Sequence, residues 1–410
     1  MSSRALTRER VVPAAVRGFL RPMQWPWWVQ VLAIYAATRL ASAVVLLFVA
    51  RYQEATPWTP ASPGYRDYTG TMWDGTWYRG IAEHGYPAEL PRGADGLVQQ
   101  NTWAFFPLYP MLVRVLMLIT GLGWSVIAPT LSLVLGGAAV LVIYRLVRSV
   151  VGPADNRAAL GTVLLIGVFP SAVILQVAYT ESLALLLIAA VLLLVRTHRY
   201  RWASVVVLAL GFTRATALPM AIVVLLHALQ RWREHRRGTE RLWPAEAWSL
   251  ALLGLVTVLA GFAWPVLVGI LTGERNAYLE TQATWRGRQA VVPVRPWFDV
   301  AAWLFGRWGV PLLIVLVVAA AALILSRATR RLGPELQGWS GGYLAYLFLV
   351  IEPGSSLFRF MLLAFPFGTV TVRASRSRWW LPALVAVGLI GQLVWTYEFW
   401  RLTPPSGWPP

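Results

Sequence analysis

The sequence contains no cysteine and no lysine, and it is poor in charge and in histidine. Without cysteine, neither disulfide bonds nor thiolate metal sites can form. The four histidines, His84, His198, His227 and His235, are too scattered along the chain to suggest a histidine metal cluster. Charged residues make up only 13% of the 410 residues, about half the share of an ordinary soluble domain. We therefore expect no large soluble domain.

Apolar residues dominate what is present, at 57% of the chain. The net charge of +18 rests on 36 basic side chains, all of them arginine. These arginines lie between apolar runs and form no continuous face, which is typical of the positive-inside rule and excludes a nucleic-acid partner. The first apolar run begins near Trp27 and is long enough to span a bilayer. We expect it to remain as a first transmembrane helix, because no small-residue cleavage site follows it.

The apolar runs predict an all-α polytopic membrane protein that forms one unit over residues 1–410, with about eleven crossings. The arginine-rich N-terminus and the run Arg231–Arg241 are expected to be cytoplasmic, and the C-terminus extracytoplasmic. The predicted spans are 28–50, 124–147, 157–176, 180–195, a pair of short helices over 202–229, 247–271, 309–326, 337–351, 357–372 and 380–398.

Two polar segments are expected on the extracytoplasmic face. The first, 51–110, carries most of the acidic residues of this half of the chain and ends in an apolar stretch from Phe105 that is too short to span. We expect that stretch to form an interfacial helix. The second segment is 272–305. Because the centres of most predicted spans lack charge, chemistry is expected at this face and not along a path through the membrane.

Asp74 stands among aromatic residues at the base of the first loop, next to Trp73. A carboxylate in a partly desolvated pocket is a plausible general base. The sequence leaves a second interpretation open, in which Asp74 caps the N-terminus of a helix.

Other candidates also have a structural interpretation. Glu83 and His84 would occupy the solvated last turn of a helix that ends before Tyr86, and the aromatic residues around Asn101 could form either an interfacial belt or a lipid groove. Glu181 at a helix N-terminus would be favoured by the helix dipole. Arginines beside apolar runs can reach the interface or bind a phosphate. The remaining candidates are Phe106, Tyr109, Tyr179, Arg214 and Arg359.

These segments resemble the PIG-V-type mannosyltransferases of glycosylphosphatidylinositol anchor synthesis and their bacterial relatives. The resemblance rests on the order and spacing of several short motifs and extends over most of the chain. The richness in Ala, Val, Leu, Gly and Arg is typical of a GC-rich bacterial genome. The motifs are Trp73-Asp74, Ile81 to Tyr86, Ala104 to Pro107, Tyr179 to Ser182 and Arg359 to Pro366.

The resemblance implies a C-type glycosyltransferase (GT-C) fold and a polyprenyl-phosphate sugar donor, with mannose as the sugar, used on the non-cytoplasmic face. It favours Asp74 as the base of an inverting displacement, and we assign the donor phosphate to Arg359 and Arg214. No cofactor and no metal is expected, because arginine can stabilise the phosphate directly. A bacterial acceptor is expected to be a glycolipid or another cell-envelope component. The residues expected to bind substrate are Trp73, Glu83, His84, Tyr86, Asn101, Phe106, Tyr109, Tyr179 and Glu181.

Two other classes of function stay open. A transporter or flippase of a lipid-linked saccharide would explain the spans but not the acidic outer loop. A non-catalytic membrane scaffold would require no site. A closed outer cavity beneath residues 51–104 would favour the enzyme, whereas a cavity that reaches both faces would favour transport.

Overall fold

The computed structural model describes residues 25–286 and 292–403. In this part of the chain all secondary-structure elements are helices, apart from one isolated β-bridge between Arg92 and Val98. The prediction of an all-α chain is confirmed for these residues. The expected cytoplasmic N-terminal arginines, the expected extracytoplasmic C-terminus and residues 287–291 of the second loop lie outside the described residues.

Five helical stretches of the described chain are long and apolar enough to cross a membrane. Many of their large apolar side chains are exposed, as expected for surfaces that face lipid. The chain is therefore a membrane protein. The five stretches are Trp27–Ala50 (α2), Trp124–Val151 (α6), Pro244–Thr272 (α11), Arg295–Arg330 and Trp380–Trp400. The fourth stretch joins α13 (Arg295–Phe305), η4 (Gly306–Trp308), α14 (Gly309–Leu325) and α15 (Arg327–Arg330). The fifth joins α19 (Trp380–Trp395) and η5 (Thr396–Trp400).

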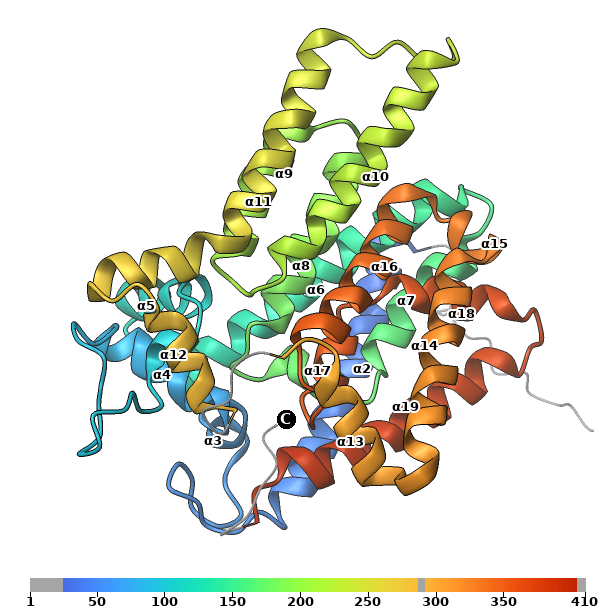
Figure 1. Ribbon diagram of the computed structural model, residues 1–410. Helices are drawn as coiled ribbons and strands as arrows, with labels where there is room; N and C mark the ends of the chain where they lie inside the picture. Colours follow the sequence, from blue (N-terminus) through green and yellow to red (C-terminus); the bar gives the residue numbers. More distant parts are fainter. Residues whose placement is uncertain (1–24, 287–291, 404–410) are drawn as a thin grey trace, which may run out of the picture.

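Shorter helices join α2 and α6 in the largest buried apolar cluster, some of them packed directly on these two spans and others on one another or on α11 (Figure 1). Small residues allow this close packing. At Gly167, for example, an added Cβ would lie 2.4 Å from Oγ1 of Thr38, so α7 can approach α2 only without a side chain there. The central helices are α7 (Asn156–Gly167), α8 (Glu181–Arg196), α9 (Tyr200–Gly211), α10 (Ala217–Arg236) and α16 (Gly333–Val350).

Three predicted spans differ from the helices observed. The segment 157–176 is α7 followed by the 3₁₀ turn η3 (Ala172–Gln176), and 357–372 is divided into α17 (Leu357–Met361) and α18 (Pro366–Ala374). Proline explains both interruptions, because Pro170 and Pro366 have no N–H to donate to the carbonyl of a preceding helical turn; Pro366 instead begins α18. Two helices occupy the segment 202–229, as predicted, but only α9, with 12 residues, is short. The prediction is wrong for α10, which has 20 residues.

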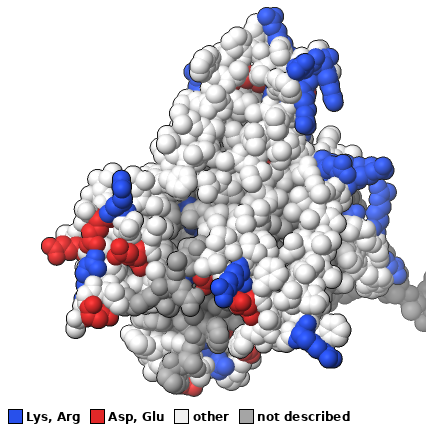
Figure 2. All heavy atoms as spheres, viewed as in Figure 1, with Lys and Arg blue, Asp and Glu red and all other residues white. Residues whose placement is uncertain are grey.

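Helices of the first loop gather at one end of the molecule with α12. Figure 2 shows acidic side chains over this region, which we call the acidic end, and arginines at the α10–α11 turn and near α15 and α18, the arginine-rich end. Arginines also lie among the acidic side chains of the acidic end, where Arg79 pairs with Glu83 and Arg92 with Glu274. The acidic-end elements are α3 (Tyr65–Gly70), α4 (Asp74–His84), η2 (Thr102–Ala104), α5 (Leu108–Thr120) and α12 (Ala277–Thr284).

Arg39 lies within the span α2 and is buried, with 5% of its surface exposed. Its Nη1 donates to the carbonyl oxygen of Ala172, and its Nη2 donates to that of Gly167 at 2.7 Å. These bonds tie α2 to the end of α7 and to η3, where the helical hydrogen bonding is interrupted. Arg39 was not singled out from the sequence, although a lone arginine inside an apolar span is expected to have a partner.

The Arg39→Leu variant is expected to unfold at a lower temperature, because the substitution leaves two buried carbonyls without donors. Unsatisfied buried groups cost about 1–3 kcal/mol each, so we expect a loss of about 2–4 kcal/mol. The matched control is Arg51→Leu, at the exposed end of the same helix. Thermal unfolding in detergent measures both. Equal melting temperatures would show that the Arg39 bonds do not stabilise the fold.

Candidate functional site

The turn at Met72–Asp74 sets the position of the Asp74 side chain. Trp73 has φ +54°, which is unfavourable for a residue other than glycine. Its indole Nε1 donates to the carbonyl oxygen of Trp400 at 2.7 Å, and its ring packs on Trp58, so tertiary contacts hold this conformation. Asp74 is the first residue of α4, and no side-chain bond caps the helix. The capping interpretation of Asp74 therefore has no geometric support.

Asp74 forms an ion pair with Arg359, which lies 285 residues further along the chain. Nη1 of Arg359 donates to Oδ2 of Asp74 at 2.5 Å. The Arg359 side chain is 8% exposed and that of Asp74 is 20% exposed. The carboxylate is thus the more accessible partner, and it stands at the edge of a buried group.

Glu181 extends this ion pair into the protein. It is the first residue of α8 and its side chain is fully buried. Its Oε1 lies 2.7 Å from Nη1 of Arg214 and 3.2 Å from Nε of Arg359. Arg214 also donates to Oγ1 of Thr180 at 2.9 Å. Asp74, Glu181, Arg214 and Arg359 form what we call the charge cluster: two carboxylates and two guanidinium groups, so that the buried charges balance.

One oxygen of the charge cluster has no partner. Oε2 of Glu181 is buried and accepts no hydrogen bond from any described residue, and Nε of Arg359 faces Glu181 without a well-directed bond. Buried polar atoms of this kind are uncommon and often mark a site that a ligand or a water completes. The charge cluster therefore has both an accessible carboxylate and unused capacity for hydrogen bonding.

Aromatic rings surround the two guanidinium groups. Cζ of Arg359 lies 5.0 Å from the ring centroid of Tyr179 and 5.2 Å from that of Phe360, and Cζ of Arg214 lies 5.1 Å from the Phe360 ring. The Tyr179 hydroxyl accepts a hydrogen bond from the backbone N–H of Asp74 at 3.1 Å. Burial raises the pKa of the Tyr179 phenol well above its usual range, so the hydroxyl stays protonated. Cation–π contacts with these rings help to hold both arginines in place.

The structure brings together five of the residues predicted from the sequence: Asp74, Tyr179, Glu181, Arg214 and Arg359. Thr180, in the same motif as Tyr179, was not singled out, although it holds Arg214. Trp73 adjoins the site and packs on Trp58, in an apolar cluster that also contains Tyr179. The roles of these residues in binding or catalysis stay predictions.

The other predicted substrate-binding residues form contacts within the protein or face solvent. Glu83 pairs with Arg79 on the solvated side of α4, and the His84 side chain is 82% exposed. Tyr86 donates to the carbonyl of Phe105 and stacks on Trp103. The other three are buried or packed at the acidic end: Asn101 caps η2, Phe106 packs on Trp264, and Tyr109 bonds Ala128 and Ser132.

An apolar cavity of about 430 Å³ lies between α5 and α9. Phe212 lines it, two residues before Arg214 in the sequence, and the Leu108 N–H donates to the Phe212 carbonyl at 2.9 Å. It is lined by Pro107, Leu108, Met111, Val205, Leu208, Ala209 and Phe212.

The chemistry that these groups allow is acid–base and electrostatic. A carboxylate can accept a proton, and two arginines can neutralise a phosphate. Among the described residues, no three His, Asp or Glu side chains are grouped so that they could hold a metal ion.

No protein-family model and no curated protein matches the chain. Solved structures similar to it include the oligosaccharyltransferase of Archaeoglobus fulgidus in the apo form, with 14% identity and a TM-score of 0.49 over 91% of this chain and 57% of that one. The oligosaccharyltransferase AglB of the same organism, in complex with an inhibitory peptide and a dolichol-phosphate, matches with 13% identity and a TM-score of 0.43 over 88% of this chain and 55% of that one. This chain thus spans little more than half the length of either neighbour, and similarity of this degree assigns no activity to it.

Proposed function

We propose that the chain is a GT-C-type glycosyltransferase that moves a sugar, mannose, from polyprenyl phosphate to a hydroxyl group of a lipid or cell-envelope acceptor on the extracytoplasmic face. The observation that supports this most is the charge cluster, in which the partly exposed carboxylate of Asp74 pairs with the buried guanidinium group of Arg359, and Glu181 links Arg359 to a second, half-buried arginine, Arg214. The apolar cavity beside Phe212 supports a lipid-linked donor, because its lining suits a hydrocarbon chain.

The reaction requires one base and one anion-binding group. The acceptor oxygen attacks the anomeric carbon, its proton passes to Asp74, and the bond from that carbon to the phosphate oxygen breaks. A single displacement of this kind inverts the anomeric configuration. The polyprenyl phosphate departs as an anion that Arg359 and Arg214 stabilise. No second carboxylic acid is required, because the leaving group is already ionised, unlike the alcohol released in sugar hydrolysis.

Arg359 exchanges partners in this proposal. Without substrate, its Nη1 bonds Asp74. When the donor binds, its phosphate replaces Asp74 as the partner of Arg359, which releases the Asp74 carboxylate to meet the acceptor hydroxyl. Glu181 keeps its contacts to both arginines and holds the two guanidinium groups side by side. Substrate binding and activation of the base are then the same event.

Transfer itself is tested with the purified protein, polyprenyl-phosphate mannose and a panel of lipid acceptors, with the mass of the product as the readout. The proposal expects an acceptor that is heavier by one hexose, together with free polyprenyl phosphate. Movement of the intact donor across vesicles without any new glycosidic product would instead support the transporter. A folded protein that neither transfers the sugar to any acceptor nor moves the donor across vesicles would favour the non-catalytic membrane scaffold.

The membrane face of the site is tested by labelling single cysteines, because the chain has none of its own. Ala94 is exposed in the first loop and Thr239 is exposed in the α10–α11 turn. In intact cells, an impermeant thiol reagent should label the Ala94→Cys variant and leave the Thr239→Cys variant unlabelled until the membrane is opened. The reverse pattern would place the charge cluster on the cytoplasmic side and would contradict the proposed topology.

A further inference from the structure

A band of aromatic rings leads from the charge cluster to the surface of the acidic end. Tyr179, whose ring lies against a guanidinium group of the charge cluster, contacts Tyr78 with 6.3 Å between ring centroids, and Tyr78 contacts Phe105 at 5.2 Å. Phe105 in turn lies 5.8 Å from Trp77 and 5.7 Å from Trp285, and the two indoles are 5.3 Å apart. We call these five residues the aromatic band.

Exposure increases along the aromatic band. Tyr179 and Tyr78 are buried, with 1% and 5% of their surface exposed. Trp77 is partly exposed, and Trp285 is 37% exposed. The inner end therefore contacts the charged groups of the proposed reaction, whereas the outer end is open to a ligand. Aromatic walls with a few polar groups nearby are typical of ligand sites.

Trp77 follows Asp74 by one turn of α4. Residues three apart on a helix lie on the same face, with about 5–6 Å between their Cβ atoms. This spacing is on the scale of a single sugar ring. A ring that covered the Trp77 indole would therefore bring its hydroxyl groups within reach of the Asp74 carboxylate.

Trp285 connects the outer end of the aromatic band to both sides of the charge cluster. It is the C-cap residue of α12, and its indole contacts Trp77 of α4. Nε of the next residue, Arg286, lies 3.8 Å from Oε1 of Glu352, in the segment before α17. The end of α12 is thus joined to the helix that carries the proposed base and to the segment that leads to the proposed phosphate ligand (Figure 1).

The chemistry of this surface suits a sugar ring. One face of a pyranose presents C–H groups, which pack on an aromatic ring and meet the negative face of its π-system. The hydroxyl groups at the rim of the sugar require polar partners, and Arg286 and Glu352 stand beside the exposed indole of Trp285. A simple alcohol or a lipid glycerol has no rigid ring with which to cover an indole.

We propose that Trp77 and Trp285 bind a sugar ring of the acceptor, so that the acceptor is a saccharide or a glycolipid. The inference rests on the proposed function and names the acceptor class of the same site. The ring stacks on the two indoles and directs one hydroxyl group at Asp74, while the donor phosphate lies at Arg359. Because Trp77 and Trp285 come from the two polar segments 51–110 and 272–305, both segments contribute to the acceptor site.

The test measures binding apart from transfer. Full-length protein, in a detergent without a sugar headgroup, is mixed with methyl α-mannopyranoside or with mannitol, which has similar hydroxyl groups but no ring. Saturation-transfer NMR should detect binding of the mannoside and much weaker binding of mannitol. Trp77→Ala and Trp285→Ala should each weaken mannoside binding by at least about fivefold, which corresponds to about 1 kcal/mol. Trp285→Tyr keeps an aromatic ring and should retain most of the binding.

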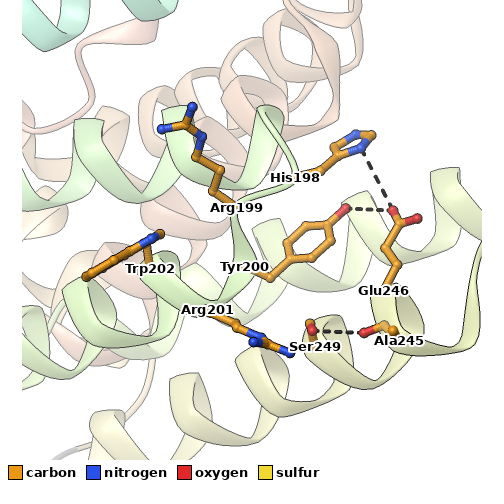
Figure 3. A pocket seen from close by; sticks show the side chains of 8 residues that line it. All are labelled: His198, Arg199, Tyr200, Arg201, Trp202, Ala245, Glu246 and Ser249. Carbon is orange, nitrogen blue, oxygen red and sulfur yellow. Dashed lines mark hydrogen bonds and ion pairs between the residues drawn. The ribbon is translucent and has the colours of Figure 1, made fainter.

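Trp202→Ala is the matched control. Figure 3 shows Trp202 at the arginine-rich end, beside a cavity of about 440 Å³ between α9 and α11, and this residue is 66% exposed. Its substitution should leave mannoside binding unchanged, and thermal unfolding confirms that each variant is folded. Equal mannoside binding by the wild type and both folded alanine variants of the aromatic band would overturn the proposal. An equal loss of binding in Trp202→Ala, or equal binding of mannitol, would also overturn it.

Transfer assays separate this inference from the proposed function. With polyprenyl-phosphate mannose as the donor, Trp285→Ala should raise the KM for the mannoside acceptor and leave the KM for the donor unchanged. Equal transfer to diacylglycerol and to the mannoside would overturn the saccharide acceptor but not the glycosyltransferase. Absence of transfer to any acceptor, with binding of the mannoside still dependent on Trp77 and Trp285, would overturn the proposed function and support the sugar site.

Discussion

The Asp74→Asn variant is expected to lose at least about 10²-fold in turnover, because an amide keeps the shape of the side chain but cannot accept the acceptor's proton. The structure adds a second expectation. Oδ2 of Asp74 accepts a hydrogen bond from Arg359, so the neutral variant leaves one excess positive charge in the charge cluster. We therefore expect a lower melting temperature as well, and turnover must be expressed per folded molecule.

Asp67→Asn is the matched control for this variant. Asp67 is exposed on α3, seven residues before Asp74, and takes no part in the charge cluster. Its substitution should change neither turnover nor melting temperature. If folded Asp74→Asn turned over normally, Asp74 would not be the base, and Glu181, with its unpartnered buried oxygen, would be the next candidate.

Substitution of Arg359 is expected to have the other large effect. The Arg359→Ala variant leaves Asp74 and Glu181 with Arg214 alone, and breaking a buried ion pair costs about 3–5 kcal/mol, so both stability and donor binding should fall. Arg359→Lys keeps the charge, but a single ammonium group cannot face both Asp74 and Glu181 as the guanidinium group does. We expect this variant to fold, with a higher KM for the donor and a turnover reduced by about tenfold or more.

Arg66→Lys serves as the control, because Arg66 is exposed on α3. The donor concentration is varied at a fixed acceptor concentration, and the KM for the donor is compared among the three proteins. A folded Arg359→Ala protein with full turnover and an unchanged KM would contradict the assignment of the donor phosphate to this residue.

Arg214 and Arg359 could be singled out from the sequence because each stands in an apolar run, where a charge is unfavourable without a partner. Glu181 stood out at the start of a predicted span, and Asp74 through the aromatic residues around it and the Trp73-Asp74 motif of the resemblance. Their pairing could not be predicted. Asp74 and Arg359 are 285 residues apart, and nothing in local spacing shows that the start of α4 meets α17. From the sequence, Arg359 was predicted only to bind the donor phosphate, whereas in the structure its Nη1 donates to Oδ2 of Asp74.

Helix positions were predicted well where an apolar run is continuous, as in α2 and α11. Hydropathy averaged over about 20 residues cannot detect an interruption of two or three residues, so the break before Pro366 was missed. Polar contacts inside spans were missed for a related reason. Arg39 looks like one unfavourable residue in an apolar helix, and only the fold shows that its partners are the carbonyls left free by the end of α7.

The most direct test of the proposed mechanism is a structure of the protein with polyprenyl phosphate bound, determined by electron cryomicroscopy in lipid nanodiscs. Partner exchange predicts phosphate oxygens at about 2.7–2.9 Å from the guanidinium nitrogens of Arg359, with the Asp74 carboxylate released and facing an open space large enough for a hydroxyl group. The Glu181 contacts to both arginines should persist. A phosphate bound elsewhere, with the 2.5 Å bond between Arg359 and Asp74 still intact, would contradict the mechanism.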